Sequence, residues 1–344
     1  MPTYRAAIIG GGSIADKNHI PALKALSDRV EVVAVVSRDA AKARTLADSH
    51  GIPHAFDQAD ALFRECQPNV VVICTPNKLH FPFAMQALEN GCHVFCEKPP
   101  AITAGQAREM AELADRKGLA LGYNFQLRQT SEWQLFERCR SEGRLGEIYH
   151  IKARFLRRRG IPGWGYFTSK DMQGGGALMD LGVHVLDLAL LALDYDLPTA
   201  VLGNTFDHIG RAGGKGLMGG WNPETFEVED AAMAYLQYAD RGSVMLSSSF
   251  ALNTGANIDR NLEIFGTQGG GVLFPFVLHT EVAGELADIH FPFLENVDIQ
   301  LKNTAAFLDA CDGKPSNVCT GEQGARLMQV VESIYQSAGT YQAT

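Results

Sequence analysis

Short apolar runs alternate with amphipathic segments between the start of the chain and residue 123. Runs rich in β-branched residues predict buried strands, and apolar residues recurring every three to four positions predict helices. The predicted strands span residues 6–10, 30–36, 70–74, 93–96 and 119–123, and the predicted helices span residues 40–49, 81–90 and 104–117. This alternation is typical of βαβ units, so a parallel sheet is expected.

The pattern changes after residue 124, where strands are indicated by alternating polar and apolar positions. The predicted strands span residues 147–157, 229–238, 242–250 and 261–265, and the predicted helices span residues 132–140, 177–193, 297–311 and 321–339. We therefore predict an α/β fold with two domains. Residues 1–123 would form a doubly wound parallel sheet, and residues 124–344 would form an α/β domain with an open, largely antiparallel sheet.

Charge and composition narrow the class of partner. The chain has 30 Lys plus Arg against 39 Asp plus Glu, and this net charge of −9 disfavours nucleic acid and acidic membranes as partners. The longest apolar run, Leu181–Leu193, is too short to span a bilayer, and the N-terminus shows no signal-peptide pattern. Seven cysteines without a C-x-x-C pair predict neither disulfides nor a metal site. We expect a cytoplasmic protein that binds a small molecule.

A glycine fingerprint follows the first predicted strand. Gly10 permits a tight turn, Gly12 allows the backbone to approach a pyrophosphate, and Ala15 keeps the following helix close to the sheet. The helix that starts here supplies N–H donors to phosphates, so Gly10, Gly12, Ser13 and Ile14 are predicted to bind a dinucleotide.

The end of the second predicted strand bears on which dinucleotide is bound. Ser37 and Arg38 stand where an NAD enzyme usually places an acidic residue for the ribose 2′-hydroxyl. A hydroxyl and a guanidinium suit a 2′-phosphate, which favours NADP. Asp39 follows at once and could reach the ribose, so NAD stays as the alternative.

Polar residues follow two further strands, at the edge where open α/β sheets bind their ligands. Thr75, Asn77 and His80 follow the strand at 70–74, and Glu97 and Lys98 follow the strand at 93–96. All five are predicted to contribute to the cofactor site.

The apolar helix predicted at residues 177–193 carries two polar residues with helical spacing. Asp180 and His184 are four residues apart, which places a carboxylate and an imidazole on one face of the helix. A glycine-rich loop at residues 174–176 leads into this helix.

These motifs resemble a known family. Glu97-Lys98-Pro99 together with Asp180-x-Gly182-x-His184-x-x-Asp187 looks like the Gfo/Idh/MocA family, the glucose–fructose oxidoreductase and inositol dehydrogenase group. Thr75-Pro76-Asn77, Tyr123-Asn124 and Gly266-Thr267-x-Gly269 also follow the family order. The resemblance implies a Rossmann domain, an α/β domain on an open sheet, and a catalytic group of Lys98, Asp180 and His184. We also expect a homodimer or homotetramer formed through the C-terminal sheet.

The chemistry of the implied catalytic group is consistent with hydride transfer. Removing a hydride from a secondary alcohol requires a base, and a histidine, with an ordinary pKa near 6.5, suits this task. His184 is the candidate base, Lys98 would hydrogen-bond the reacting oxygen, and Asp180 would orient the substrate or the histidine.

Four residues are predicted to shape the substrate pocket. Arg157 ends a basic strand, and Trp164 in the following loop would stack on a sugar ring. The resemblance implies that Tyr123 and Asn124 lie near the nicotinamide and the substrate.

The leading hypothesis is an NAD(P)-dependent dehydrogenase or reductase that acts on a ring hydroxyl of a sugar, glycoside or cyclitol. A redox-neutral, NAD-dependent glycosidase or lyase would use the same residues. A non-catalytic dinucleotide-binding regulator is the third alternative.

Overall fold

The structure is a computed structural model that describes residues 3–240 and 242–339. It divides into two compact units. The first unit runs to Gln129 and includes Asp298–Ala325; the second comprises Thr130–Val297 and the chain from Arg326 onward. We describe each unit separately.

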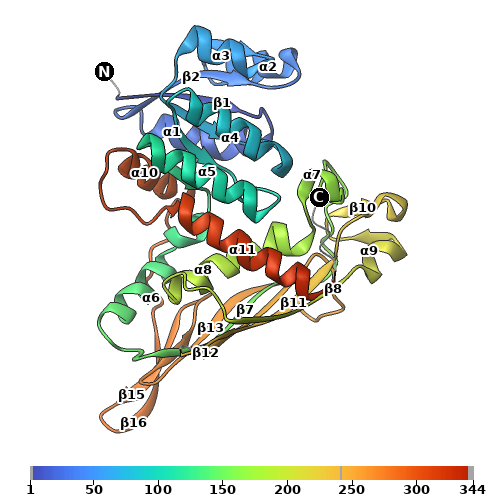
Figure 1. Cartoon of the computed structure of the whole chain (residues 1–344). Helices are drawn as coiled ribbons and strands as arrows, with labels where there is room; N and C mark the ends of the chain where they lie inside the picture. The colour runs from blue at the N-terminus through green and yellow to red at the C-terminus, as the bar shows by residue number, and fades with distance from the viewer. Residues whose placement is uncertain (1–2, 241, 340–344) are drawn as a thin grey trace. The chain divides into compact units, whose positions relative to one another are not determined.

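The first unit is built on a twisted parallel sheet (Figure 1). Its strands lie in the order β17 (Cys319–Thr320), β6 (Leu121–Tyr123), β5 (His93–Cys96), β4 (Val70–Ile73), β1 (Tyr4–Ile9), β2 (Val30–Val36) and β3 (His54–Phe56). All neighbours are parallel except β17, which pairs antiparallel with β6. The chain order reverses on either side of β1, and ligands of doubly wound sheets bind at the carboxyl ends of the strands at such a point.

Helices connect these strands and bury their apolar sides against the sheet. They are η1 (Ala15–His19), α1 (Ile20–Ala25), α2 (Ala40–Ser49), α3 (Ala59–Cys66), η2 (Asn77–Leu79), α4 (His80–Glu89), α5 (Ala104–Lys117), η3 (Gln126–Gln129) and α10 (Ile299–Cys311). Asp39 caps the N-terminus of α2 and Thr103 that of α5. Gly118 ends α5 in the left-handed conformation, as a C-terminal cap requires.

The bounds of the two units differ from those of the predicted domains, residues 1–123 and 124–344. Residues 298–325 return to the first unit, where β17 extends the sheet beyond β6. Phe307 of α10 stacks on Phe95 with ring centroids 4.7 Å apart. A contact between segments so far apart in the chain leaves no local pattern in the sequence. The short strand β3 was also missed, because its three residues are only partly buried.

The second unit contains a mostly antiparallel sheet. Its strands lie in the order β16 (Glu285–His290), β15 (Val277–Val282), β14 (Gly270–Val272), β13 (Ile258–Gly266), β7 (Ile148–Arg157), β12 (Gly242–Ser249), β11 (Ala231–Tyr238) and β8 (Ala200–Phe206). Only the pair of β7 and β12 is parallel among these described strands. The predicted fold class, a doubly wound parallel sheet followed by a largely antiparallel one, is therefore confirmed.

The remaining elements of this unit lie around the sheet. They are α6 (Ser131–Ser141), α7 (Lys170–Gln173), η4 (Leu178–Gly182), α8 (Val183–Ala192), α9 (His208–Ala212), the hairpin β9 (Gly214–Gly216) and β10 (Gly219–Trp221), and η5 (Pro223–Thr225). The last helix, α11 (Gly321–Ser337), begins in the first unit and ends in the second.

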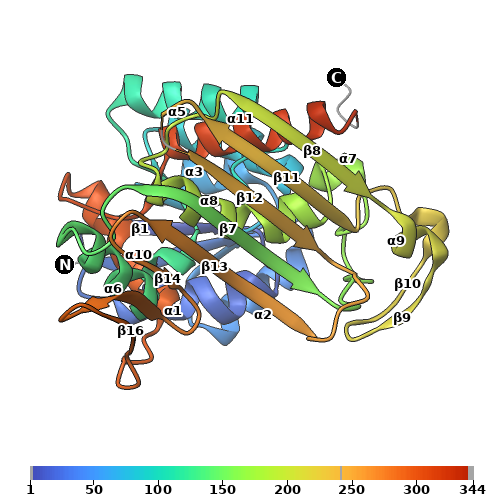
Figure 2. The same ribbon diagram turned by 90° about the horizontal axis from the view of Figure 1, so that it is seen from below.

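The apolar helix α8 covers one face of the second sheet and packs against β7 and β13. Figure 2 views the sheet from its opposite face, where β8, β11, β12, β7 and β13 lie side by side. By length and composition the segment Lys170–Ala192 could cross a membrane, and it is longer than the predicted apolar run because α7 and η4 precede α8. Within its most apolar stretch of 18 residues, 83% is buried inside the molecule.

Candidate active site

The glycine turn after β1 has the geometry that a dinucleotide requires. Gly10 has a φ of +109°, and a Cβ there would lie 2.5 Å from the carbonyl oxygen of Cys74, so the turn passes directly against β4. A Cβ at Gly12 would meet nothing within 4 Å, and the first turn of η1 begins just beyond, with exposed Ser13 and Ile14 between them. This open space beside a helix start fits a pyrophosphate.

Three side chains follow β2, those of Ser37, Arg38 and Asp39, and they differ in their contacts with the rest of the protein. Asp39 uses Oδ1 to accept hydrogen bonds from the N–H groups of Ala41 and Lys42, at 3.0 and 3.2 Å. Ser37 lies against the glycine turn, 3.2 Å from the position of a Cβ at Gly11. Arg38 is exposed and forms no hydrogen bond or ion pair with another described residue. The guanidinium is therefore available to a ligand.

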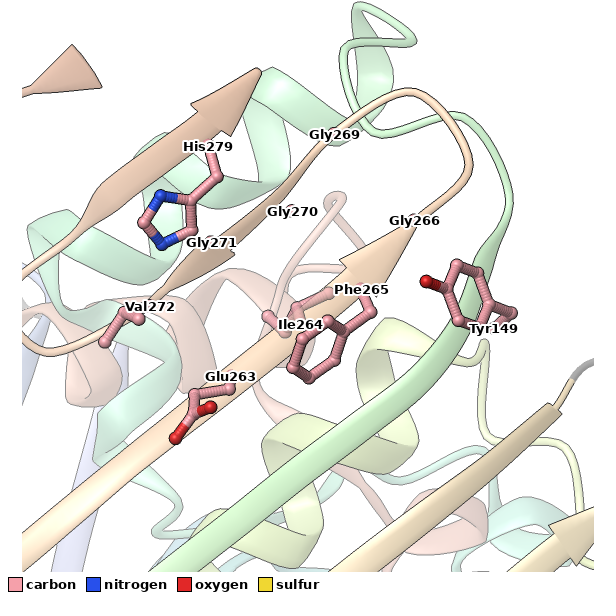
Figure 3. A pocket seen from close by; sticks show the side chains of 10 residues that line it. All are labelled: Tyr149, Glu263, Ile264, Phe265, Gly266, Gly269, Gly270, Gly271, Val272 and His279. Carbon is pink, nitrogen blue, oxygen red and sulfur yellow. The ribbon is translucent and has the colours of Figure 1, made fainter. Parts of the chain in front are cut away.

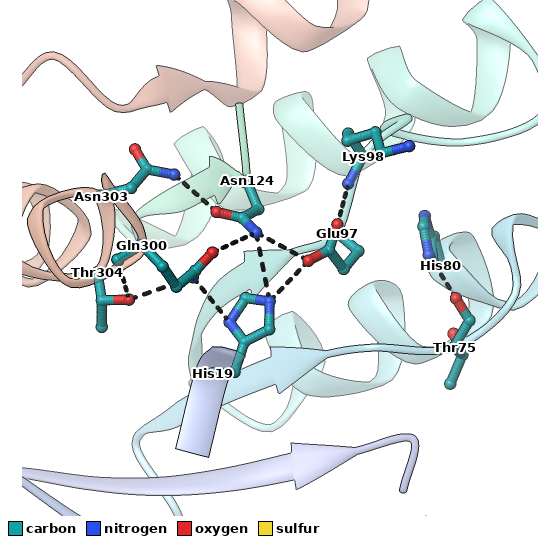
Figure 4. Close-up of polar contacts among 9 residues, drawn as sticks. All are labelled: His19, Thr75, His80, Glu97, Lys98, Asn124, Gln300, Asn303 and Thr304. Atoms are coloured by element: carbon teal, nitrogen blue, oxygen red, sulfur yellow. Dashed lines mark hydrogen bonds and ion pairs between the residues drawn. The ribbon is translucent and has the colours of Figure 1, made fainter. Parts of the chain in front are cut away.

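The residues after β4 include one hydroxyl without a hydrogen-bond partner among the described residues and two buried polar side chains. The buried Oγ1 of Thr75 has no hydrogen-bond partner among the described residues, and Asn77 is buried at the start of η2. Both ring nitrogens of His80 contact main-chain oxygens, Nδ1 that of Pro99 at 2.8 Å and Nε2 that of Thr75 at 2.9 Å (Figure 4). Burial lowers the pKa of His80. His80 thus joins the segments after β4 and β5, with both ring nitrogens engaged and the residue 0% exposed.

Lys98 is singled out by its exposure. Within residues 94–101 every residue is buried except Lys98, which is partly exposed at the end of β5. Its side chain leads away from the buried polar residues around Glu97 (Figure 4). The main-chain N–H of Lys98 donates to Glu97 Oε2 at 3.2 Å. The structure therefore holds the lysine by its backbone and directs its amine outward.

Glu97 belongs to a buried polar cluster that we call the His19 cluster: His19, Glu97, Asn124, Gln300 and Asn303 (Figure 4). Glu97 Oε1 contacts His19 Nε2 at 2.7 Å and accepts a hydrogen bond from Asn124 Nδ2 at 2.8 Å. Burial favours the neutral carboxyl, but the bond to His19 outweighs it and lowers the pKa of Glu97 to about 2. Because both carboxylate oxygens are engaged, the predicted role of Glu97 as a cofactor ligand is not supported by its contacts.

Tyr123 and Asn124 are buried rather than positioned at a ligand. Asn124 is 1% exposed, and its amide donates to Glu97 and Gln300 while Oδ1 accepts from Asn303 Nδ2 at 2.8 Å. Tyr123 is 0% exposed and packs against Gly324, which has no room for a Cβ beside the tyrosine ring. This burial argues against the predicted substrate contacts of both side chains, and it arises from the return of residues 298–325 over this strand end.

In the second unit, Asp180 and His184 stand out on their helix. Every residue from 177 to 190 is buried except these two, which are partly exposed. They come from η4 and α8, which continue one another, so one face presents both groups as the i, i+4 spacing predicted. Asp187 is fully buried and accepts a hydrogen bond from the hydroxyl of Tyr195, which assigns it to the core.

The inner face of the second sheet surrounds these two groups. The ring centroids of Phe155 and His184 are 6.3 Å apart, and the guanidinium carbon of Arg157 lies 5.8 Å from the Phe155 centroid. Burial lowers the pKa of Arg157, whereas the charge of Asp180 raises it. Trp164, 52% exposed, contacts the ring of Phe167 edge-on. The structure thus brings Arg157, Asp180 and His184 into one neighbourhood and leaves Trp164 at the surface.

Sequence reasoning missed the residue that anchors the start of this helix. Glu229 is buried and accepts hydrogen bonds from the N–H groups of Gly176 and Leu178, at 2.8 and 2.9 Å, and from the hydroxyl of Tyr335. Burial raises the pKa of Glu229, against the effect of these donors. In the sequence Glu229 is one acidic residue at the start of a predicted strand, so no signal marked its role.

A cavity of about 240 Å³ lies elsewhere in the second unit, beside β13, β14 and β15 (Figure 3). Tyr149, Glu263, Phe265 and His279 line it, together with the glycines of β14. None of the predicted site residues lines this cavity. It is therefore separate from the candidate active site.

Comparisons with known proteins identify both halves of the chain. Residues 4–125 match the model of an oxidoreductase family with an NAD-binding Rossmann fold, and residues 133–271 match the Gfo/Idh/MocA C-terminal domain. The chain is 39% identical to D-glucoside 3-dehydrogenase of Escherichia coli (strain K12), with 98% of this chain and 95% of the relative covered. It is 30% identical to a putative UDP-kanosamine synthase oxidoreductase subunit of Amycolatopsis mediterranei (strain S699), over 98% and 97%.

Solved structures share the fold over nearly the whole chain. Levoglucosan dehydrogenase in complex with NADH and levoglucosan superposes with a TM-score of 0.83 at 20% identity, over 98% of this chain and 97% of that one. GenD2 from gentamicin A biosynthesis in complex with NAD has a TM-score of 0.79 at 24% identity, over 98% and 95%. The expected family and its oxidoreductase class are thereby confirmed: this chain belongs to the Gfo/Idh/MocA family of oxidoreductases.

Proposed function

We propose that the chain is an NAD(P)-dependent dehydrogenase or reductase that acts on a ring hydroxyl of a sugar, glycoside or cyclitol. The observation that carries the proposal is the exposure of Asp180 and His184 alone in an otherwise buried segment, residues 177–190. A carboxylate and an imidazole four residues apart at the accessible face of a buried helix are groups suited to bind and deprotonate a polar ligand. The glucoside dehydrogenase and levoglucosan dehydrogenase relatives support a carbohydrate substrate.

Each side chain has a role in this reaction. A nicotinamide cofactor, which the glycine turn after β1 and the residues after β2 would hold, would supply hydride transfer to or from the carbinol carbon. His184 takes the hydroxyl proton, and Asp180 orients the substrate or the imidazole. For Lys98, of the first unit, the proposed role is a hydrogen bond to a reacting oxygen that stabilises the negative charge developing on it. Arg157 and Phe155 contribute a polar and an apolar wall to the sugar site.

The test is a substrate panel followed by the absorbance of reduced nicotinamide and by product analysis. A dehydrogenase converts cofactor and sugar in equal amounts, and the product carries a new carbonyl group. Release of an aglycone without net change in the cofactor would identify a redox-neutral glycosidase or lyase instead. Cofactor binding without turnover of any sugar, glycoside or cyclitol would favour a non-catalytic, dinucleotide-binding regulator.

NADP is the proposed preferred cofactor. Arg38 is exposed and suits a 2′-phosphate, whereas Asp39 accepts two main-chain N–H groups of α2 with Oδ1. A charge-assisted bond contributes about 1.5 to 3 kcal/mol. We expect Arg38→Ala to raise the Kd for NADPH about tenfold to a hundredfold with little effect on NADH, measured by nucleotide fluorescence.

The control for this prediction is Arg64→Ala, because Arg64 is an exposed arginine on α3 that pairs with Glu65 at the surface. Arg64→Ala should leave both affinities unchanged. Tighter binding of NADH than NADPH by the unmodified chain, unaffected by Arg38→Ala, would establish NAD as the cofactor.

We also propose that the second sheet forms a homodimer or homotetramer. Leu202, Tyr235 and Met245 are cross-strand neighbours in one row of its outer face, with exposures of 67%, 43% and 48%. Lys152 continues this row beside Met245 and pairs with Glu263. An apolar row flanked by paired charges suits contact with a second copy. Light scattering after size exclusion should give the mass of two or four chains, and a monomer at micromolar concentration would contradict the proposal.

A further inference from the structure

The His19 cluster joins parts of the first unit that carry different portions of the candidate cofactor site. His19 ends η1, the helical turn that follows the glycine fingerprint, and its side chain is 0% exposed. Glu97 ends β5 and directly precedes Lys98. The contact between His19 Nε2 and Glu97 Oε1, 2.7 Å long, links residues 78 positions apart in the chain.

The polar atoms of the cluster are matched to one another. Glu97 Oε1 is shared by His19 and Asn124, and Oε2 accepts the main-chain N–H of Lys98. Gln300 of α10 accepts a hydrogen bond from Asn124 Nδ2 at 3.0 Å with its Oε1. A buried carboxylate is stable only when its oxygens have such partners, so loss of one partner disturbs the others.

His19 and Glu97 each stabilise the charged form of the other. Burial lowers the pKa of His19, but the neighbouring Cys74 and Glu97 outweigh burial and raise it to about 10. The bond to His19 in turn keeps Glu97 ionised. An ionised carboxylate is a stronger acceptor for the main chain of Lys98 than a neutral carboxyl group would be.

We propose that His19 is a positioning residue for Lys98: acting through Glu97, it fixes the main chain that presents the lysine amine relative to the glycine turn. This inference rests on the proposed function, in which Lys98 contacts the reacting oxygen. His19 is 0% exposed and contacts Glu97 Oε1 at 2.7 Å, so its proposed effect on the reaction passes through Glu97. A displacement of Lys98 by about 1 Å is enough to lower the rate about a hundredfold.

The test compares His19→Gln with the unmodified protein. Glutamine retains an N–H donor but removes the imidazole and its charge. We expect kcat to fall about tenfold to a hundredfold, while the Kd for the reduced nucleotide changes less than about threefold. Glu97→Gln, which weakens the same acceptor, should produce the same separation of kcat from Kd, and it replaces His19→Gln if that variant does not fold.

A Lys98→Ala background distinguishes positioning from general damage. If His19 acts through Lys98, then adding His19→Gln to Lys98→Ala should not lower kcat further. An additional loss of the same size as in the single variant would show that His19 has only a structural role. Wild-type kcat in both His19→Gln and Glu97→Gln would overturn the proposal outright.

The matched control is His50→Gln. His50 Nε2 contacts Asp16 of η1 at 2.7 Å, the same distance as in the buried pair, but this pair is partly exposed and does not touch the Lys98 segment. Its kcat should equal that of the unmodified protein. Should Lys98→Ala itself retain full activity, the proposed function fails, whereas an inactive Lys98→Ala beside a fully active His19→Gln rejects the positioning role alone.

Discussion

Replacing Lys98 with Met is expected to lower kcat by about a hundredfold to a thousandfold, the usual effect of losing one donor to a developing oxyanion. Lys98 is the one partly exposed residue in the buried segment 94–101, and its backbone is held by Glu97. Methionine retains the length of the side chain without the charge. Nucleotide affinity should therefore change little, and steady-state kinetics together with nucleotide titration would measure both quantities.

Two further variants sharpen this prediction. Lys98→Arg retains a positive charge but presents a planar guanidinium, so we expect it to restore only a small part of the rate. Lys117→Met, at the exposed C-terminus of α5, should have no effect on kcat. A Lys98→Met variant within threefold of the unmodified kcat would show that the amine does not contact the reacting oxygen.

Replacing His184 with Gln is expected to lower kcat by about a hundredfold to ten-thousandfold, the contribution of a general base. The limb of the pH profile of kcat/KM that reports this base should disappear, because no group would titrate in its place. Rates measured across pH, with substrate at saturating and limiting concentrations, test both statements. His208→Gln is the control, since His208 is an exposed histidine on α9 of the same unit.

The double variant tests whether both residues act on one oxygen. If they do, Lys98→Met and His184→Gln combined should lose much less than the product of the two single effects. Fully multiplicative losses would show that the two side chains act on separate steps. An unchanged pH profile in His184→Gln would assign the base to another residue.

Much of the fold could be predicted from local pattern. The strands at 30–36 and 93–96 and the helices at 40–49 and 104–117 have the predicted bounds, because each is a buried apolar run or an amphipathic segment with its own cap or glycine stop. The short, half-exposed strands β3, β8 and β16 were missed. Their burial depends on neighbours in the sheet rather than on their own residues.

Some residues of the candidate site could likewise be predicted from local sequence pattern, and others could not. The glycine turn, Lys98, and the spacing of Asp180 and His184 follow from short motifs whose chemistry is local. The roles of His80 and Asn124 could not be predicted in this way, because both owe their hydrogen bonds to distant segments. The amide of Asn124, for example, donates to Gln300, 176 positions away.

The sequence by itself determined the class of the protein: a dinucleotide-binding turn, a lysine at a strand end, and an acid and an imidazole on one helical face. Only the tertiary structure decided which polar side chains remain accessible. Tyr123 and Asn124 are buried by the return of residues 298–325 to the first unit, and Glu229 binds the start of the helix that carries Asp180 by a contact across 53 positions. Exposure is a property of packing, and packing between distant segments has no local signature.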